Sequence, residues 1–569
     1  MSLRGGLAAV LTLVLVVWHT FGDLVFRIRY PMIGANPDAY GTLWMYQWVR
    51  DEVEAGRFPV STDQMYAPEG MNFFVRNGAN VLDALLSIPL QWLLGGGRAE
   101  LWTCVVIVVG NALSFFPLAR KLAPASTASA ILCTAWWAAN PFVLFELSGG
   151  RPTQALLWFV PPAVAALLRL QGYRDAMILG LCVGLQGLTY WYLPLFFAVV
   201  MGPTAILRSI REPGSLRYLS LAVGIALLLV APVAIPIAQA ASAGTIPGLD
   251  VTLETSGVWT ESAERSRRLF SHLGMVSTLV PLLAVFSRWR SAPGLAIGVL
   301  LAVVFAVGAR LSFSGQSLNN YPYQWLFEHS SLVARLNFPS RILSVVYCVG
   351  ALSLVPVLAE ARTRVLPVLF GALSLLEHRA NKLAPTRSLS MPPLPASFIV
   401  AAHPGPILSV PMGAPEVAMV QQAFHGQVMV SGMGDHVESV RSPAYDVLLE
   451  NLWFTELVQA DERMRPWTRA EEAAIRKEVR WVWFDRALLA RGLNSHLTDS
   501  IDTRLRMALG EPYYEDDYTV LWNLADTEAR ADEADKALAA AAEAEMDLEE
   551  ERAKGGQERG VIWTWSMPE

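Results

Sequence analysis

A polar stretch between residues 30 and 80 carries the carboxylates best suited to catalysis. Asp38 follows an Asn-Pro pair and precedes a helical pattern, so its carboxylate suits either a helix N-cap or a general base that deprotonates a hydroxyl group. Glu69 lies in a Pro-Glu-Gly turn and, like Asp63, is an alternative carboxylate. Long loops beside packed elements are usually functional or disordered, and the aromatic content of this loop favours function.

Two tryptophans of the same stretch, Trp44 and Trp48, are four residues apart and therefore share one face of a helix. Indole rings anchor helices at a membrane interface, and they also offer flat apolar faces on which a sugar ring can stack. The spacing is compatible with both functions. We therefore expect either membrane anchors or a sugar-binding surface here.

Glu146 and Arg151 flank a Ser-Gly-Gly turn between two apolar segments. Charged side chains beside lipid are costly unless they pair or reach water, so a mutual ion pair is one interpretation. The other is that Arg151 binds a phosphate group, because a guanidinium offers a planar fork that matches phosphate oxygens. Tyr190 and Tyr192 lie at a turn between later apolar segments, where they either line the same cavity or belong to an aromatic belt.

A late pair of arginines, Arg335 and Arg341, brackets the sequence Leu-Asn-Phe-Pro-Ser ahead of another apolar segment. These side chains are either a second cationic contact for a phosphate or ordinary loop charges. Convergence of Asp38, Arg151 and Arg341 on one cavity that is open to both lipid and water would favour an enzyme, whereas a scatter over separate surfaces would favour a non-enzymatic protein.

Metal and nucleotide motifs are missing from the sequence. His425 and the Asp435-His436 pair do not have a recognised ligand spacing, so we predict no metal site from them. Whether a divalent cation (Mg²⁺ or Mn²⁺) takes part in catalysis stays open. The sequence contains no nucleophile elbow, P-loop or dinucleotide fingerprint. It also has no basic patch interleaved with aromatic residues, so we predict no binding to nucleic acid.

The elements that position these residues are mainly apolar helices. With 53% hydrophobic and 17% charged residues, the 569-residue chain is predicted to be an integral membrane protein. Nine apolar segments are long enough to cross about 30 Å of hydrocarbon. A further apolar run at 176–207 suits two helices that turn near 189–192, so the total is about eleven spans. The single segments are 6–26, 101–119, 127–146, 153–168, 217–240, 272–287, 294–310, 341–359 and 363–377.

Basic residues predict the orientation of these helices. Arginines and lysines near positions 4, 120, 169, 208, 288 and 362 fall at alternate ends of the spans and hence on one face, which we assign to the cytoplasm. All these basic residues fall on the same face only if Leu82–Leu94 does not cross the membrane. We therefore predict that this segment is an amphipathic helix lying in the membrane interface. The result is a multi-pass protein of the cell (inner) membrane with a cytoplasmic N-terminus.

Changes in hydropathy divide the chain into four segments. We predict an α-helical transmembrane domain at 1–380, whose first outer loop covers 27–100, and a linker at 381–395. Short apolar runs that alternate with helical patterns predict a compact extracytoplasmic α/β domain at 396–525. The acidic, Ala/Glu-rich residues 526–569 have no apolar stripe wide enough for a core and are predicted to be a solvated, partly disordered helical tail.

Several short motifs resemble those of the GT-C-type polytopic membrane glycosyltransferases and their uncharacterised bacterial relatives. The matching pieces are a first-loop sequence from Gly34-Ala-Asn-Pro-Asp38 to Tyr66-Ala-Pro68-Glu69-Gly70, the span opening Gly149-Gly-Arg151-Pro-Thr-Gln154, the sequence Phe338-Pro-Ser-Arg341, and the outer segment from Ile407-Leu-Ser-Val-Pro411 to Val430-Ser-Gly432. The resemblance touches most of the chain and implies a GT-C-like fold for the membrane domain.

The same resemblance implies an activity: inverting transfer of a sugar from a polyprenyl-phosphate-linked donor to a glycan, lipid or protein acceptor outside the membrane. By position, the implied general base is Asp38. The chain departs from many relatives because no second acid lies beside Asp38 and because Arg151 stands where relatives often carry histidine. These departures predict either an altered substrate or a member that has lost activity.

Two alternatives belong to other functional classes. One is a transporter or flippase for a lipid-linked glycan, and the other is a non-catalytic assembly subunit with the same fold. A transporter predicts charged residues at mid-span and broken helices, whereas the charges here cluster at the ends of the predicted spans. This distribution favours chemistry at the membrane interface, with membrane lipid and the lipid-linked donor as partners.

Overall fold

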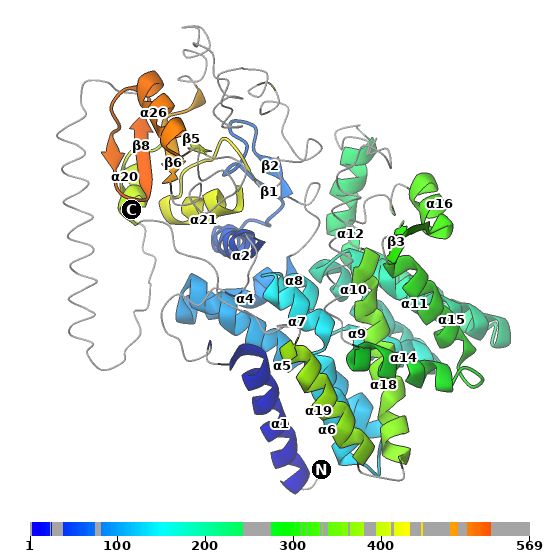
Figure 1. Cartoon of the computed structure of the whole chain (residues 1–569). Coiled ribbons are helices and arrows are strands. Elements are labelled where there is room, and N and C mark those ends of the chain that lie inside the picture. Colours follow the sequence, from blue (N-terminus) through cyan, green and yellow to red (C-terminus); the bar gives the residue numbers. More distant parts are fainter. Residues whose placement is uncertain are drawn as a thin grey trace. The chain divides into compact units, whose positions relative to one another are not determined.

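The chain folds into two compact units, which we describe separately with the element labels of Figure 1. The helical unit contains Met1–Asn36, Asn77–Leu90 and Arg98–Ser388, and the mixed unit contains Pro37–Arg76, Gln91–Gly97 and Leu389–Glu569. The computed structural model describes residues 3–22, 38–73, 81–242, 275–308, 310–313, 316–330, 339–361, 365–380, 394–410, 415–432, 478–486 and 498–524, with the single residues Leu24, Ile33, Val333, Tyr445 and Val447.

Apolar helices build the helical unit. They begin with α1 (Leu3–Phe21), α4 (Leu82–Leu94), whose last turn belongs to the mixed unit, and α5 (Gly96–Leu122). The central series is α6 (Thr127–Ala138), α7 (Pro141–Ser148), α8 (Pro152–Ala155), α9 (Val160–Arg169), α10 (Tyr173–Thr189), α11 (Tyr192–Arg211) and α12 (Ser215–Ser242). The last are α14 (Met275–Ser287), α15 (Pro293–Ala306), the 3₁₀ helix η2 (Pro339–Ile342), α18 (Leu343–Glu360) and α19 (Val365–Ala380).

Five helical segments among the described residues are long and apolar enough to cross a membrane: Arg98–Leu122, Thr127–Ser148, Tyr192–Arg211, Ser215–Pro236 and Pro339–Glu360. Two of them each join two helices named above, α6 with α7 and η2 with α18. Shorter apolar helices accompany them. The chain is an integral membrane protein, and the prediction of a polytopic helical domain is confirmed. Several of the about eleven predicted spans correspond to shorter or interrupted helices, although the predicted turn between α10 and α11 is found at Tyr190 and Trp191.

Two predicted spans are interrupted. Residues 127–146 form α6 and α7, which separate at Asn140, and residues 153–168 form α8 and α9. Proline accounts for both breaks, because Pro141 and Pro161 lie in the first turns of the new helices and lack the N–H that a continuing helix requires.

Side-chain amides from neighbouring helices satisfy the backbone at the second break. Asn111 on α5 accepts a hydrogen bond from the Leu157 amide at 2.9 Å and donates one to the Ala155 carbonyl at 2.9 Å. Gln186 on α10 donates to the Leu156 carbonyl at 2.8 Å. Irregular backbone is tolerated at membrane depth only where it is buried in protein or lines a cavity. These two amides therefore stabilise the interruption.

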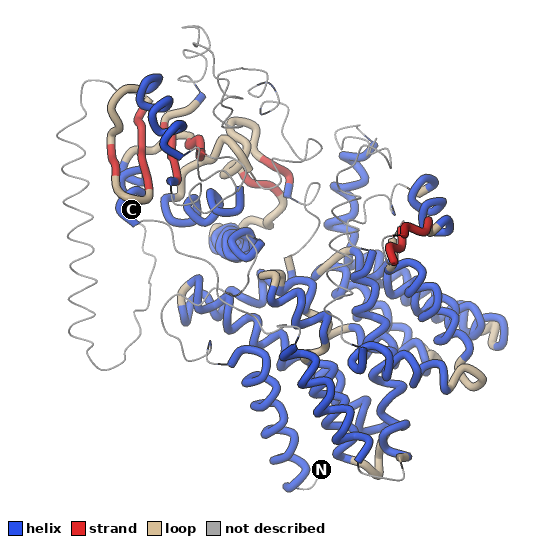
Figure 2. Tube along the Cα trace, in the orientation of Figure 1, coloured by secondary structure: helices blue, strands red, loops and turns tan. Residues whose placement is uncertain are grey.

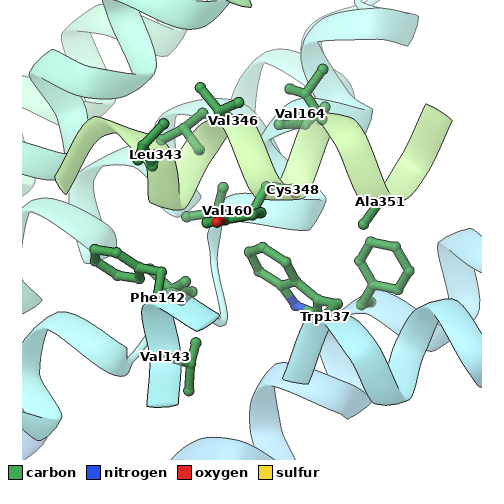
Figure 3. Close-up of a cluster of buried hydrophobic side chains, with 14 of the residues drawn as sticks. Trp137, Phe142, Val143, Val160, Val164, Leu343, Val346, Cys348 and Ala351 are labelled. Carbon is green, nitrogen blue, oxygen red and sulfur yellow. The ribbon is translucent and has the colours of Figure 1, made fainter. Parts of the chain in front are cut away.

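Helix α18 is central to the helical unit. In its most apolar window 83% of residues are buried, against 11% in α12, which presents most of its surface away from the protein. Figure 3 shows Val346 and Leu343 of α18 together with Trp137 of α6, Phe142 of α7 and Val160 of α9. The two broken spans therefore pack around one continuous helix.

Helix α4 has its polar face buried and its apolar face exposed. Asp83, Ser87 and Gln91 are buried, whereas Trp92 and Leu93 are exposed. The Asp83 carboxylate accepts a hydrogen bond from the Thr153 hydroxyl at 2.7 Å. An exposed apolar face suits a helix that contacts lipid. The predicted helix at Leu82–Leu94 is found with these bounds, and its position in the membrane interface stays a prediction.

A short hairpin follows α15 in the helical unit and is drawn in red in Figure 2. β3 (Arg310–Phe313) pairs antiparallel with β4 (Gln316–Asn319), and α16 (Tyr321–His329) comes next. The Asn320 amide donates to the carbonyls of Val304 and Gly308, each at 2.7 Å, so it satisfies backbone groups at the end of α15.

A four-stranded sheet forms the centre of the mixed unit (Figure 2). The strand order is β5-β6-β8-β7, with β5 parallel to β6 and the other pairs antiparallel. All five residues of β6 are buried, so both faces of the sheet are covered. The elements are β5 (Ile407–Val410), β6 (Trp481–Asp485), β7 (Tyr514–Glu515), β8 (Thr519–Asn523), α20 (Leu394–Ala402), α21 (Pro415–His425) and α26 (Thr498–Leu509). The predicted α/β character is confirmed.

The first loop of the sequence folds together with the C-terminal residues in the mixed unit. It contains α2 (Asp38–Glu54), β1 (Ser61–Thr62) and β2 (Met71–Asn72). Helix α2 packs on α21. The amide of Met429 also donates to the carbonyl of Gln64 at 2.9 Å. The predicted tail at 526–569 and most of the predicted linker at 381–395 lie outside the described residues.

Candidate functional site

A buried carboxylate joins two arginines in the helical unit. Glu146 on α7 accepts a hydrogen bond from Arg151 Nε at 2.6 Å and another from Arg341 Nε at 2.8 Å. The side chains of Glu146, Arg341 and Arg151 are 1%, 7% and 16% exposed. The predicted Glu146–Arg151 ion pair is thus present, and Arg341 is its third member.

Tyr190 completes this cluster, which we call the Glu146 cluster (Glu146, Arg151, Tyr190 and Arg341). Its hydroxyl accepts a hydrogen bond from Arg341 Nη1 at 2.7 Å, and the guanidinium carbon lies 5.2 Å from the ring centroid. Tyr192 packs edge-to-face on Tyr190, with ring centroids 4.8 Å apart. Tyr192 therefore packs directly against a member of the cluster.

Local backbone geometry brings Arg151 back to Glu146. The α7 helix ends at Ser148, and Gly150 adopts a left-handed conformation with φ of 72°, which reverses the chain. The amide of Arg151 then donates to the Glu146 carbonyl at 2.9 Å. A Cβ atom at Gly149 would lie 2.6 Å from Arg151 Nη2, so the guanidinium group lies directly over this glycine.

The cluster members come from the ends of three helical segments. Glu146 and Arg151 lie around the end of α7, Tyr190 directly follows α10, and Arg341 lies in η2 just before α18. Among the described members, two guanidinium groups share one carboxylate. A buried ion pair is stable only when its members are hydrogen-bonded, as all are here. The arrangement places positive charge at a helix terminus, where it can bind a phosphate.

The carboxylates of the first loop lie in the mixed unit. Asp38 is exposed at the first residue of α2, which agrees with a position at the start of a helix. Glu69 is also exposed, in the turn before β2. Gly70 in the same turn has φ of 72°, a conformation that favours glycine. The roles of Asp38 and Glu69 in binding or catalysis stay predictions.

Trp44 and Trp48 are core side chains of the mixed unit. They are 1% and 2% exposed, and their rings stack 5.5 Å apart with an interplanar angle of 9°. Phe73 packs against both rings, and Trp44 Nε1 donates to Gln422 Oε1 at 2.6 Å. The prediction that they share a helix face is correct. Their burial gives no support to membrane anchoring or sugar stacking, because neither ring offers an open face.

The remaining candidates are Arg335, His425 and the Asp435-His436 pair. Arg335 lies outside the described residues, as does the Asp435-His436 pair. His425 is buried in the mixed unit, where burial lowers its pKa to about 3 and its Nδ1 accepts a hydrogen bond from the Gln427 amide. No group of three or more His, Cys, Asp or Glu side chains among the described residues could hold a metal ion.

Three residues with buried side-chain amides lie on the segments around the second helix break, and neither their type nor their spacing in the sequence marked them as site candidates. They are Asn111, Gln154 and Gln186. Gln154 belongs to the span-opening motif that contains Arg151, which is the one signal that could have drawn attention to it. Asn111 and Gln186 lie within long apolar runs and carry no charge, so neither composition nor spacing marks them.

No protein-family model matches the chain, and no curated protein matches it. Among solved structures, it is similar to the Archaeoglobus fulgidus oligosaccharyltransferase in the apo form, with 11% identity, a TM-score of 0.47, and coverage of 87% of this chain and 71% of that one. The same values hold for AglB of that organism in complex with an inhibitory peptide and a dolichol-phosphate. ArnT from Cupriavidus metallidurans bound to undecaprenyl phosphate has 11% identity, a TM-score of 0.40, and coverage of 93% and 98%.

Proposed function

We propose that this membrane protein is a GT-C-type glycosyltransferase that moves a sugar from a polyprenyl-phosphate-linked donor to an acceptor outside the membrane. The observation that carries the proposal is the Glu146 cluster. Two guanidinium groups are held in defined positions by one carboxylate at the ends of apolar helices. A lipid-linked phosphate suits such a position, because its tail needs an apolar surface while its oxygens need charge-assisted donors.

Arg151 is the proposed phosphate ligand and Arg341 its support. Arg151 is the more exposed of the two arginines, at 16% against 7%. Arg341 donates to both Glu146 and Tyr190, so its position is determined by two partners. In the transfer, these cations would stabilise the negative charge that develops on the departing phosphate.

Asp38 is the proposed general base. The acceptor hydroxyl would lose its proton to this carboxylate while its oxygen attacks the anomeric carbon of the donor sugar. The bond from that carbon to the phosphate oxygen breaks, and the polyprenyl phosphate leaves with the bonding electrons. Attack from the face opposite the phosphate inverts the configuration at the anomeric carbon.

Replacing Asp38 with asparagine tests the assignment. Asparagine keeps the shape and can still cap α2, but it cannot take the proton. We expect the rate of sugar transfer from a panel of radiolabelled polyprenyl-phosphate sugars to fall at least about 100-fold in Asp38→Asn. Asp517→Asn, which removes another exposed carboxylate of the same unit, is the matched control and is expected to keep most of the activity. An unchanged rate in Asp38→Asn would refute its role as the base.

Transport of a lipid-linked glycan is the second candidate, because the interrupted spans at α6–α7 and α8–α9 are a feature that transporters use. The two functions make different products. A transferase converts the labelled donor into free polyprenyl phosphate and a glycosylated acceptor, whereas a transporter moves the intact donor across a vesicle membrane. Movement of intact donor without release of polyprenyl phosphate would favour transport.

A further inference from the structure

Two buried amide oxygens, on segments that also carry members of the Glu146 cluster, have no hydrogen-bond donor among the described residues. Gln154 on α8 is 8% exposed and Gln186 on α10 is 3% exposed. Within the part of the chain that the structure describes, no donor reaches Oε1 of either side chain. Buried polar atoms in proteins nearly always have a partner, so each orphan acceptor requires an explanation.

The orientation of the Gln186 amide is determined by its own donors. Its Nε2 donates to the Leu156 carbonyl at 2.8 Å and lies 2.7 Å from the Thr189 hydroxyl. These two contacts hold Nε2 against the helix break and leave Oε1 as the acceptor. The Gln186 oxygen is therefore a preorganised acceptor.

Both amides are one helical turn from members of the Glu146 cluster. Gln154 follows Arg151 by three residues, and Gln186 precedes Tyr190 by four, with the Tyr190 amide donating to the Gln186 carbonyl at 3.1 Å. The Gln186 side chain also reaches the segment that carries Gln154, because it binds the carbonyl of Leu156, two residues after Gln154. The orphan acceptors thus lie on the segments that position the cluster.

We propose that the amide oxygens of Gln154 and Gln186 accept hydrogen bonds from hydroxyl groups of the sugar attached to the lipid phosphate. This inference rests on the proposed function and adds a sugar-recognition subsite to it. Amide oxygens that lack a donor need a ligand rich in O–H groups. A phosphodiester at neutral pH has no proton to donate and the polyprenyl tail has no polar group, so the sugar is the part of the donor that matches.

Gln154→Met is the sharpest variant for this subsite. Methionine has nearly the same length and shape, and the change breaks no hydrogen bond to the Gln154 oxygen within the described residues. Gln186→Met is less suitable because it also removes the contacts to Leu156 and Thr189. We therefore expect Gln154→Met to fold with an unchanged melting temperature.

The measurement is binding to the full-length protein in lipid nanodiscs. Dissociation constants are compared for bare undecaprenyl phosphate and for a panel of undecaprenyl-phosphate hexoses and pentoses. Wild type is expected to bind at least one sugar-bearing ligand more tightly than the bare phosphate. Gln154→Met is expected to bind that ligand about tenfold more weakly, the loss of one hydrogen bond, and to bind the bare phosphate as wild type does.

Two further variants separate this inference from the proposed function. Gln421→Met removes a buried amide of the mixed unit, which donates to Asp485 at 3.0 Å, and is expected to leave both dissociation constants unchanged. Arg151→Gln is expected to weaken both ligands. If Arg151→Gln changes neither dissociation constant, the phosphate site of the proposed function is wrong, regardless of the dissociation constants measured for Gln154→Met.

Three results would overturn the subsite itself. One is a panel in which no sugar-bearing ligand binds wild type more tightly than the bare phosphate. Another is an equal effect of Gln154→Met on both kinds of ligand. The third is a lower melting temperature with unchanged binding, which would mean that Gln154 holds only a buried water.

Discussion

At the scale of single residues, Glu146 connects the helical segments of its unit. Its carboxylate accepts hydrogen bonds from Arg151 and from Arg341, which is 195 residues away in the sequence. With 1% of its side chain exposed, water does not compensate its charge. Within the described cluster, Glu146 therefore neutralises one of the two guanidinium charges, and its carboxylate contributes to stability as well as to the charge of the site.

Glu146→Gln is expected to destabilise the protein by about 3–5 kcal/mol, because it removes the buried carboxylate that accepts charge-assisted hydrogen bonds from two guanidinium groups. The measurement is thermal or denaturant unfolding of the protein in nanodiscs. Glu212→Gln is the matched control: Glu212 pairs with Arg208 at 3.1 Å but is 61% exposed, so its loss is expected to cost about 0–1 kcal/mol. Similar losses in both variants would mean that the Glu146 cluster is not sealed from water.

Sequence reasoning identified most members of the site but not how they combine. The types of Glu146, Arg151, Tyr190 and Arg341 marked each of them as a candidate, because charge and aromatic rings at the end of an apolar run are informative. The hydrogen bonds that join these residues could not be predicted from the sequence, because the end of α7, the end of α10 and η2 must pack together before Arg341 reaches Glu146. The orphan acceptor of Gln154 is visible only when every neighbouring donor has been placed.

For Trp44, the sequence predicted the helix face correctly but did not predict its burial. Its four-residue spacing from Trp48 correctly predicted a shared helix face, but the sequence could not show what covers that face. The partner of Trp44 is Gln422, which is 378 residues away. A pattern in one helix predicts which side chains face together, whereas their burial depends on long-range packing.

At the scale of elements, glycine allows close approach between helices. Gly294 and Gly298 lie four residues apart on α15 and face α11, and a Cβ atom at Gly298 would lie 1.8 Å from the Val200 carbonyl oxygen. Small residues at this spacing let helix backbones pack closely in membranes, where packing contacts replace the hydrophobic effect as the driving force. The α11–α15 pair therefore depends on Gly298.

Gly298→Ala is expected to destabilise the protein by about 1–3 kcal/mol, because the added methyl group forces the backbones of α11 and α15 apart. Gly202→Ala on α11 is the control, since nothing lies within 4 Å of the position that a Cβ atom would take there, and alanine is expected to be neutral or stabilising by up to about 1 kcal/mol. Unfolding in nanodiscs measures both. An equal change in unfolding free energy for Gly298→Ala and Gly202→Ala would show that the close contact between α11 and α15 does not contribute to stability.

The helix breaks show where hydropathy reasoning ends. A window of apolar residues counts Pro141 and Pro161 as ordinary members, so it predicts single spans across 127–146 and 153–168. In the structure both spans are interrupted, and at the second break Asn111 forms hydrogen bonds with the Ala155 carbonyl and the Leu157 amide. The presence of apolar segments was predictable from composition, but their continuity depends on polar partners supplied by other helices.

At the scale of the whole molecule, the function requires a definite orientation in the membrane. Basic residues such as Lys121, at the end of α5, are predicted to face the cytoplasm, because positive charges are retained on that side. The first loop is predicted to face outside, and the proposed transfer to an external acceptor depends on this arrangement. Exposed positions on each predicted side make the orientation measurable.

Asp63→Cys is expected to react with a membrane-impermeant maleimide added to intact cells, whereas Lys121→Cys is expected to react only after the membrane is permeabilised. Both positions are exposed, so access to the reagent depends on the side of the membrane. Background from the native thiols is expected to be small because Cys104, Cys133 and Cys348 are buried, and Cys182→Ala removes the half-buried one. Labelling of Lys121→Cys but not Asp63→Cys in intact cells would reverse the orientation and remove the basis for transfer to an external acceptor.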